Sequence, residues 1–182
     1  LSGLVSGTRR GLRSFRWGRP ARSCAVVQAA ALLLGPGVSL EAGSILREVY
    51  EGIQGTAVSD LTGASIYPDS PTQTNFVTDY FEAPVDWSDN YGQRMHGFVV
   101  PPATGNYTFW ISSDDASELW LSTDENPANE RLIAWVGGWT PSREWAWEAN
   151  QQSSPVALQQ DKAYYVKALQ KEGGGGDNLA VR

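Results

Sequence analysis

Two adjacent acids, Asp114 and Asp115, are the residues whose types and spacing best fit metal chemistry. Strand-like runs flank the pair, and neighbouring side chains in a regular strand point to opposite faces. The two carboxylates can share one cation only if the backbone bends between them, through a bulge, a turn or a rare cis peptide. Like charges held together need a cation between them, and calcium prefers oxygen ligands of this kind. The alternative is a solvated turn joining two strands.

A glycine run near the end of the chain precedes a second set of oxygen atoms. Four glycines, residues 173–176, let the backbone approach another loop closely or adopt positive φ. Asp177 and Asn178 follow directly, just before a predicted strand. A flexible turn is the alternative interpretation. No Lys-Ser/Thr pair or helix signal follows, so the segment does not resemble a phosphate-binding loop.

Tryptophan is concentrated in one part of the chain, where seven of the eight fall between Trp87 and Trp147. Most of these large rings are expected to fill a core between sheets or to cover its edges. Trp139 lies in the turn-like segment Gly137-Gly138-Trp139-Thr140-Pro141. It is therefore the best candidate for an aromatic ring that stacks on a ligand.

The segments around these residues predict an all-β chain, an antiparallel β-sandwich of jelly-roll-like type. Short alternating or aromatic runs are separated by Gly, Pro, Asn and Asp, and the helical period is weak. Pro101–Gly105 is predicted to be the turn of a hairpin. The predicted strands are Ile45–Ile53, Asn75–Phe81, Tyr91–Val100, Asn106–Ser112, Glu118–Ser122, Arg131–Val136, Ser154–Leu158, Ala163–Gln170 and Asn178–Arg182.

Charge is distributed unevenly along the chain. Residues 1–42 contain six arginines and one acid, whereas residues 43–182 contain eight basic and nineteen acidic residues, a net charge of −11. An acidic body of this kind repels phosphate backbones, so nucleic acid is not expected as a partner. The one cysteine is Cys24 and the one histidine is His96. Residues 43–182 therefore hold no disulfide, thiolate cluster or histidine-rich metal site.

Residues 1–42 are predicted to be a leader of the signal-peptide type. A basic stretch, Arg9–Arg22, precedes an apolar run, Cys24–Leu34, and small residues follow. The apolar run is shorter than the roughly 20 residues that span a bilayer, so no membrane span is expected. An arginine-rich organelle presequence is the alternative. The leader indicates a secreted or cell-surface protein, and the chain ends inside a predicted strand. We therefore expect residues 43–182 to be one domain, truncated at its C-terminus, of a larger polypeptide.

The motifs follow one another in an order that resembles the protective-antigen-type, or "PA fourteen", domain. The resemblance covers Ile45 to Arg182, and this family is found in bacterial toxins, glycosidases, and fungal flocculins and adhesins. It implies a β-sandwich. The segments that carry it are Arg47–Tyr50, Phe81–Pro84, Gly97–Phe109, Ser113–Leu121 and Glu172–Gly176.

The resemblance also implies a ligand set. Adhesin members of the family bind sugars through calcium held by the two aspartates, which a cis peptide joins. An Asn on a neighbouring loop and backbone carbonyls two and four residues after it complete the protein ligands. The corresponding positions here are Asp114, Asp115, Asn178 and the carbonyls of Ala180 and Arg182. Glycan contacts are predicted for Asp114, Asp115, Trp139 and Asp177.

The function implied is a calcium-dependent, lectin-like carbohydrate-binding module in adhesion, with glycans as partners and no catalytic role of its own. Two alternatives remain open. The domain is either a structural spacer, or an accessory domain of a glycoside hydrolase whose catalytic part lies beyond residue 182.

Overall fold

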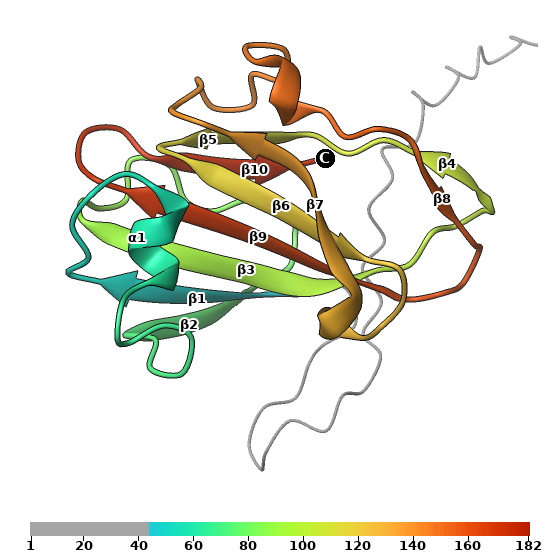
Figure 1. The fold of residues 1–182 in the computed structure, drawn as a ribbon, viewed down its shortest axis with the longest axis horizontal. Helices are drawn as coiled ribbons and strands as arrows, with labels where there is room; N and C mark the ends of the chain where they lie inside the picture. Colours follow the sequence, from blue (N-terminus) through green and yellow to red (C-terminus); the bar gives the residue numbers. More distant parts are fainter. Residues whose placement is uncertain (1–43) are drawn as a thin grey trace, which may run out of the picture.

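The computed structural model describes residues 44–182, which form two packed β layers (Figure 1). The larger layer is a six-stranded antiparallel sheet in the order β2-β1-β3-β9-β6-β7. Its strands are β1 (Ile45–Glu51), β2 (Gln73–Val77), β3 (Tyr91–Val99), β6 (Ser117–Ser122), β7 (Glu130–Val136) and β9 (Tyr164–Glu172). The predicted leader, residues 1–42, lies outside the described residues.

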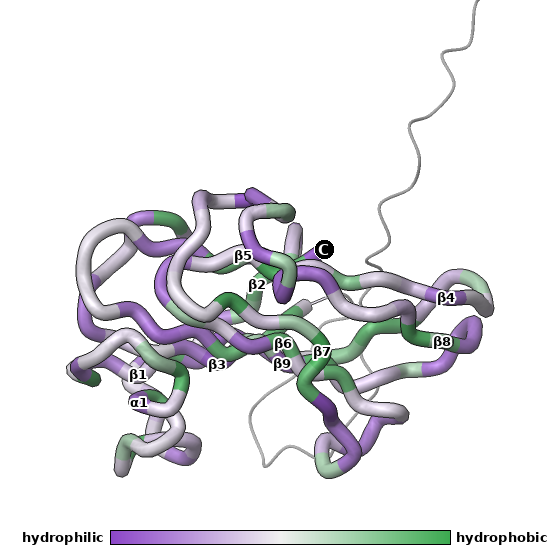
Figure 2. Tube along the Cα trace, turned by 45° about the horizontal axis from the view of Figure 1, so that its top comes forward, coloured by the Kyte–Doolittle hydropathy of each residue, from purple (hydrophilic) through white to green (hydrophobic). Residues whose placement is uncertain are grey.

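Two strand pairs form the smaller layer. β5 (Ile111–Asp114) pairs antiparallel with β10 (Asn178–Val181), and β4 (Gly105–Tyr107) pairs antiparallel with β8 (Val156–Leu158). Figure 2 places β5 above β6 and β9, and it shows apolar stretches in β7 and β8. The predicted all-β antiparallel sandwich is confirmed.

The main core lies between the two layers and follows from the period-2 alternation of the strands. Met95, Ala168 and Leu119 lie on one rung across β3, β9 and β6, and all are fully buried. Ile111 of β5 and Leu179 of β10 belong to the same apolar cluster. The large sheet therefore turns one face toward the smaller layer along its central strands.

A second apolar cluster covers the opposite face of the large sheet. It includes Leu61 of the short helix α1 (Val58–Thr62), packed with Tyr50 and Leu169. Gly92 makes room for this helix, because a Cβ there would lie 2.6 Å from Leu61 Cδ1. No helix is predicted here from the sequence, because five residues are too few to display a helical period. Two 3-10 turns, η1 (Pro127–Asn129) and η2 (Ala149–Gln151), lie in later connections.

The hairpin predicted at Pro101–Gly105 is wrong. β3 pairs with β1 and β9, while β4 pairs with β8, so the chain passes from one layer to the other at this point. The strand predicted at Asn106–Ser112 divides into β4 and β5. Among residues 44–182, no helix has the length and apolar character needed to cross a membrane.

Candidate functional site

The two adjacent aspartates lie where the chain crosses between the layers. Asp114 is the last residue of β5 in the small sheet, and Ser117 begins β6 in the large sheet. The peptide bond between Asp114 and Asp115 is cis. The segment 173–177 makes the return crossing, from the end of β9 to the start of β10. Both crossings lie at the same end of the sandwich.

Strand register brings one further polar residue to each aspartate. In the small sheet, Asn178 lies opposite Asp114. In the large sheet, Ser117 lies opposite Gln170, and the same antiparallel register continued outward places Glu172 opposite Asp115. The Asp115 amide N–H indeed donates to Glu172 Oε2 at 3.0 Å. Each aspartate is therefore positioned by a different sheet.

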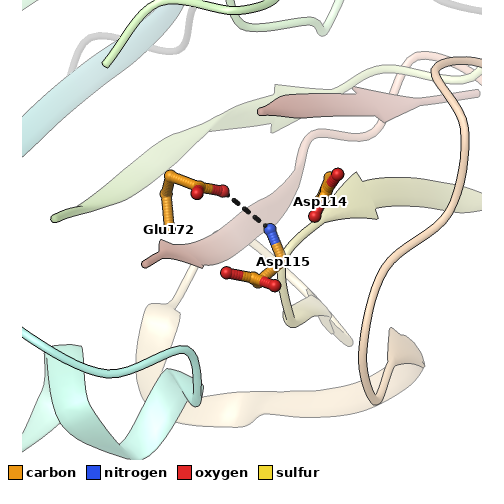
Figure 3. Close-up of side chains that lie close together, drawn as sticks. All are labelled: Asp114, Asp115 and Glu172. Atoms are coloured by element: carbon orange, nitrogen blue, oxygen red, sulfur yellow. Dashed lines mark hydrogen bonds between the residues drawn. The ribbon is translucent and has the colours of Figure 1, made fainter. Parts of the chain in front are cut away.

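Three carboxylates converge at this point. Asp114, Asp115 and Glu172 each offer an oxygen atom, and these atoms lie within 4.8 Å of one another. Figure 3 shows the three side chains together, with the hydrogen bond from the Asp115 amide to Glu172. The Gly173 N–H donates to Asp115 Oδ2 at 3.0 Å, which fixes the second carboxylate. The first residue of the glycine run thus serves the acid cluster, defined here as Asp114, Asp115 and Glu172.

Within residues 44–182 the acid cluster has no ion-pair partner, although the Lys171 charge acts on Asp115 and Glu172 from a longer distance. None of the four ion pairs within residues 44–182 includes one of its members. Burial, followed by the charges of Asp115, Asp177 and Asp86, raises the pKa of the Asp114 carboxyl to about 6. Burial, followed by the neighbouring aspartate charges, raises the pKa of Glu172 to about 7. A bound cation would relieve the repulsion between like charges that are held together without an ion-pair partner.

Three buried oxygen atoms around the cluster lack a hydrogen-bond donor. They are Glu172 Oε1, Asp177 Oδ1 and Asn178 Oδ1, and their residues are 0%, 1% and 5% exposed. Buried polar atoms are nearly always bonded, so unbonded acceptors beside three carboxylates indicate a ligand. The donor set consists of carboxylate and amide oxygens, which suits a hard cation such as calcium. The residues present therefore fit the ion that the resemblance implies.

A series of buried side-chain hydrogen bonds supports the backbone of Asp114. The Gln170 side-chain amide donates to the Asp114 carbonyl at 2.6 Å, and Gln93 donates to Gln170 at 2.7 Å. Arg47 in turn donates to Gln93 at 2.5 Å. All three side chains are at least 97% buried, which holds the carbonyl of Asp114 in a fixed place.

The carbonyls predicted as ligands at Ala180 and Arg182 are not brought to the acid cluster. Ala180 lies inside β10 opposite Ser112, two residues further along the strand than Asn178. At about 3.3 Å per residue, the Ala180 carbonyl lies about 7 Å further along the strand than the Asn178 carbonyl. The Arg182 carbonyl already accepts the Trp110 N–H at 2.8 Å. The physical reason is that Asn178 begins a strand, as predicted, so the residues after it extend along β10 and away from the acid cluster.

Asp177 binds the backbone of a neighbouring loop, a role that was not predicted from the sequence. Its Oδ2 accepts the backbone N–H groups of Trp87 and Ser88, at 2.9 and 2.8 Å. The side chain is 1% exposed and its other oxygen, Oδ1, is buried as well, so the predicted contact with a glycan would need this loop to open. Asp177 therefore holds the loop that begins at Asp86 beside the site.

Trp139 lies on a loop that is bonded to the site. The next residue, Thr140, donates its N–H to the Ser113 carbonyl at 2.6 Å. The Thr140 carbonyl accepts the Asn178 side-chain amide at 3.0 Å. Trp139 itself is 53% exposed, so its ring is available to a ligand that reaches this loop.

Glu172 is the site residue that sequence reasoning missed as a ligand. It sits at the end of β9 directly before the glycine run, and its carboxyl is completely buried. The available signal was an acid placed between an alternating strand and four glycines. Only the register of β9 against β6 turns that position into a neighbour of Asp115.

Comparison with known proteins gives the family. A family model described as the PA14 domain matches residues 53–179. In Mus musculus, N-acetyl-beta-glucosaminyl-glycoprotein 4-beta-N-acetylgalactosaminyltransferase 1 is 36% identical over 144 residues, which is 76% of this chain and 14% of that protein. The chain thus spans only 14% of the length of that relative.

Two solved structures share the fold. The PA14 domain of the MpAFP antifreeze protein has a TM-score of 0.56 at 13% identity, covering 81% of this chain and 86% of that one. The Epithelial Adhesin 9 A domain from Candida glabrata, solved with Galb1-4GlcNAc, has a TM-score of 0.53 at 12% identity. That alignment covers 87% of this chain and 86% of the adhesin domain. These likenesses confirm the sandwich fold.

Proposed function

The chain belongs to the PA14 domain family, and from this membership and the geometry of the acid cluster we propose that the domain is a calcium-dependent carbohydrate-binding module. The observation that carries the proposal is the convergence of three carboxylates within 4.8 Å beside buried oxygens that have no donor. The Candida adhesin domain of the same fold was solved with a disaccharide, which supports a glycan as the ligand.

Within the proposed site, the chain supplies the ligands and their orientation. Asp114, Asp115 and Glu172 provide carboxylate oxygens, and Asn178 Oδ1 provides an amide oxygen. Calcium held there would offer further coordination positions to pairs of sugar hydroxyls. Trp139, exposed on the adjoining loop, would pack against the apolar face of the sugar ring.

We place the domain outside the cell or at its surface. Extracellular calcium modules bind their ion with dissociation constants of about 10⁻⁴–10⁻³ M, which suits a small, partly open site of this kind. The adhesin relationship points the same way.

The domain is proposed to be non-catalytic, and the mouse relative indicates a place for it in a larger enzyme. That relative is named as a glycosyltransferase, and the match covers only 14% of its length. A glycan-binding module attached to a glycosyltransferase would hold the acceptor glycoprotein near the catalytic domain. Assaying glycosyl transfer by a full-length protein with and without Asp114→Asn tests this: the variant should raise KM for glycoprotein acceptors and leave kcat unchanged.

The central experiment measures calcium and glycan binding by the same protein. Calorimetric titration with calcium, followed by a glycan array in calcium or in chelator, should show binding of both for the wild-type chain. Asp114→Asn should remove both, whereas Asp79→Asn, which neutralises an exposed acid outside the cluster, should remove neither. Calcium binding without any glycan signal would leave a structural role for the ion and overturn the lectin proposal. Calcium-independent glycan binding would overturn the role of the ion.

A further inference from the structure

We propose that Trp147 and Trp139 together form an aromatic shelf that binds a second sugar unit, so that the domain selects oligosaccharides over monosaccharides. The inference rests on the proposed function and adds the length of the ligand to it.

The shelf is a pair of exposed rings in contact with one another. Trp139 and Trp147 have ring centroids 5.8 Å apart, with an interplanar angle of 37°. They are 53% and 58% exposed, so more than half of each ring is not used by the fold. Tryptophan normally buries most of its large apolar surface in a core or an interface. Two such rings presented side by side indicate a surface made for a ligand.

The loop that carries the shelf is fixed without help from the two rings. It spans residues 137–148 between β7 and β8, and Figure 1 shows this connection standing beside β5. Its two ends are joined by the Gly137 N–H, which donates to the Glu148 carboxylate at 3.3 Å. Directly after it, the fully buried Gln151 of η2 donates to the carbonyls of Glu144, inside the loop, and Ile111 of β5, at 2.6 and 3.0 Å.

A further ion pair holds the outer part of the same loop. The Arg143 guanidinium meets the Glu82 carboxylate through Nη2 at 2.7 Å and Nε at 3.0 Å. Compact closed loops with internal bonding are frequently functional. Because the loop is already ordered, little conformational entropy is lost when a ligand settles on the rings.

The shelf adjoins the acid cluster through a continuous set of contacts. Asn178 of the site donates to the Thr140 carbonyl, Trp139 directly precedes Thr140, and Trp147 contacts Trp139. A sugar unit that extends from the cluster past Asn178 toward Thr140 would therefore have Trp139 as its neighbour. Trp147 is reached from the site through Trp139, so it would contact a unit linked to the first one.

The chemistry of the surroundings selects the class of ligand. The cluster is acidic and is accompanied by Asp86 and Asp177, which disfavours chains that carry phosphate, sulfate or carboxylate groups. Neutral glycans present apolar C–H faces to aromatic rings and keep their hydroxyls in water. A neutral oligosaccharide of at least two units is thus the occupant that fits both the cluster and the shelf.

The experiment compares ligand lengths on one printed array in calcium. The array carries neutral monosaccharides, including galactose, together with di- and trisaccharides that contain them, including Galβ1-4GlcNAc. The full chain is compared with Trp147→Ala, Trp139→Ala and the control Trp135→Ala. Trp135 of β7 is 40% exposed and pairs with Glu118 of β6, on the face of the sheet that points away from the core. Thermal melts confirm that each variant is folded.

Wild-type protein should bind the longer glycans more tightly than the matching monosaccharide. Trp147→Ala should lower oligosaccharide affinity by about five- to tenfold and leave monosaccharide affinity within about twofold. Trp139→Ala should lower both, and Trp135→Ala neither. The shelf is overturned if Trp147→Ala loses affinity for monosaccharides and oligosaccharides equally, or loses none. It is also overturned if the wild type binds both lengths with equal affinity. If chelator-sensitive monosaccharide binding persists in those cases, the proposed function stands. If no glycan binds in calcium, both fall.

Discussion

Replacing Glu172 with glutamine tests the charge balance of the acid cluster. The amide keeps the size of the side chain, and its oxygen can still accept the Asp115 N–H that Glu172 accepts at 3.0 Å. What the substitution removes is one of three negative charges within 4.8 Å. The variant therefore separates the repulsion between carboxylates from the shape of the site.

The sign of the effect without metal follows from the raised pKa values. Burial and the neighbouring carboxylates raise the pKa of Glu172 to about 7 and the pKa of Asp114 to about 6, from ordinary values of 4.5 and 3.8. The folded state then holds protons more tightly than the unfolded state, so the free energy of unfolding falls as pH rises through this window, from about 4 to about 7. One pKa unit corresponds to about 1.4 kcal/mol, and solvent screening reduces the total. We expect Glu172→Gln to raise the free energy of unfolding by about 1–2 kcal/mol at pH 8 in chelator, and by nothing near pH 4.

Calcium should stabilise the wild type more than the variant. An ion at a hundred times its dissociation constant stabilises the folded state by about 2.7 kcal/mol, or roughly 8–10 °C in melting temperature for a domain of this size. The variant has lost one carboxylate ligand, so it should gain less than half of this at the same calcium concentration. Thermal melts at pH 8, in chelator and across a calcium titration, give both quantities.

Glu125→Gln is the matched control, because Glu125 is an exposed glutamate between β6 and β7, outside the cluster. It should behave like the wild type in chelator and in calcium. The reasoning is refuted if Glu172→Gln melts no higher than the wild type in chelator at pH 8. It is equally refuted if calcium raises the melting temperature of both proteins by the same amount.

Three further perturbations test the frame around the site. Burial alone would raise the pKa of the Glu48 carboxyl, but hydrogen bonds from His96 and Arg94 lower it to about 2. The stabilisation that Glu48 provides is therefore present above about pH 4.5 and is lost as the pH falls toward 2. The unfolding free energies of the wild type and Glu48→Gln, measured in acid titrations, should converge near pH 2. Gly92→Ala should destabilise the fold by about 1–3 kcal/mol, because the new methyl meets Leu61, and adding Leu61→Ala should relieve the clash in urea melts. Leu119→Ala should cost about 2–5 kcal/mol in the same assay, since its side chain is fully buried in the main core; a loss below 1 kcal/mol would contradict that packing.

The strands could be predicted because their signals are local. Tyr91–Val100 and Ala163–Gln170 are short runs that contain aromatic and β-branched residues and are followed by turn residues. They correspond to β3 and β9 within two residues at each end. The hairpin at Pro101–Gly105 failed because the same turn chemistry also serves a crossing between layers. Nothing local says which strand will be the hydrogen-bonded neighbour, and β4 pairs with β8 some fifty residues later.

The part of the site that is local in the sequence was predictable, and the part that depends on strand pairing was not. Asp114 and Asp115 are adjacent in sequence, and their proximity to Asn178 came from a resemblance in motif order. Glu172 becomes a neighbour only through the register of β9 on β6, and a shift of one residue would point it to the other face. The Ala180 carbonyl was assigned from the resemblance, in which the Asn lies on a loop, whereas Asn178 begins β10, as the strand prediction for Asn178–Arg182 implied.

The position of the acid cluster explains how binding and stability are joined in this fold. Asp114 is fixed by β10 of the small sheet, and Asp115 is fixed by Glu172 of the large sheet. An ion shared by these residues would therefore tie the two layers together at the end where both crossings occur. The loops around that end, residues 86–89 and 137–148, are attached to the cluster by Asp177 and Thr140 rather than by core packing. Changes in those loops can alter the ligand while the core between the sheets is unchanged, which is the arrangement expected of a binding module whose specificity varies on a constant frame.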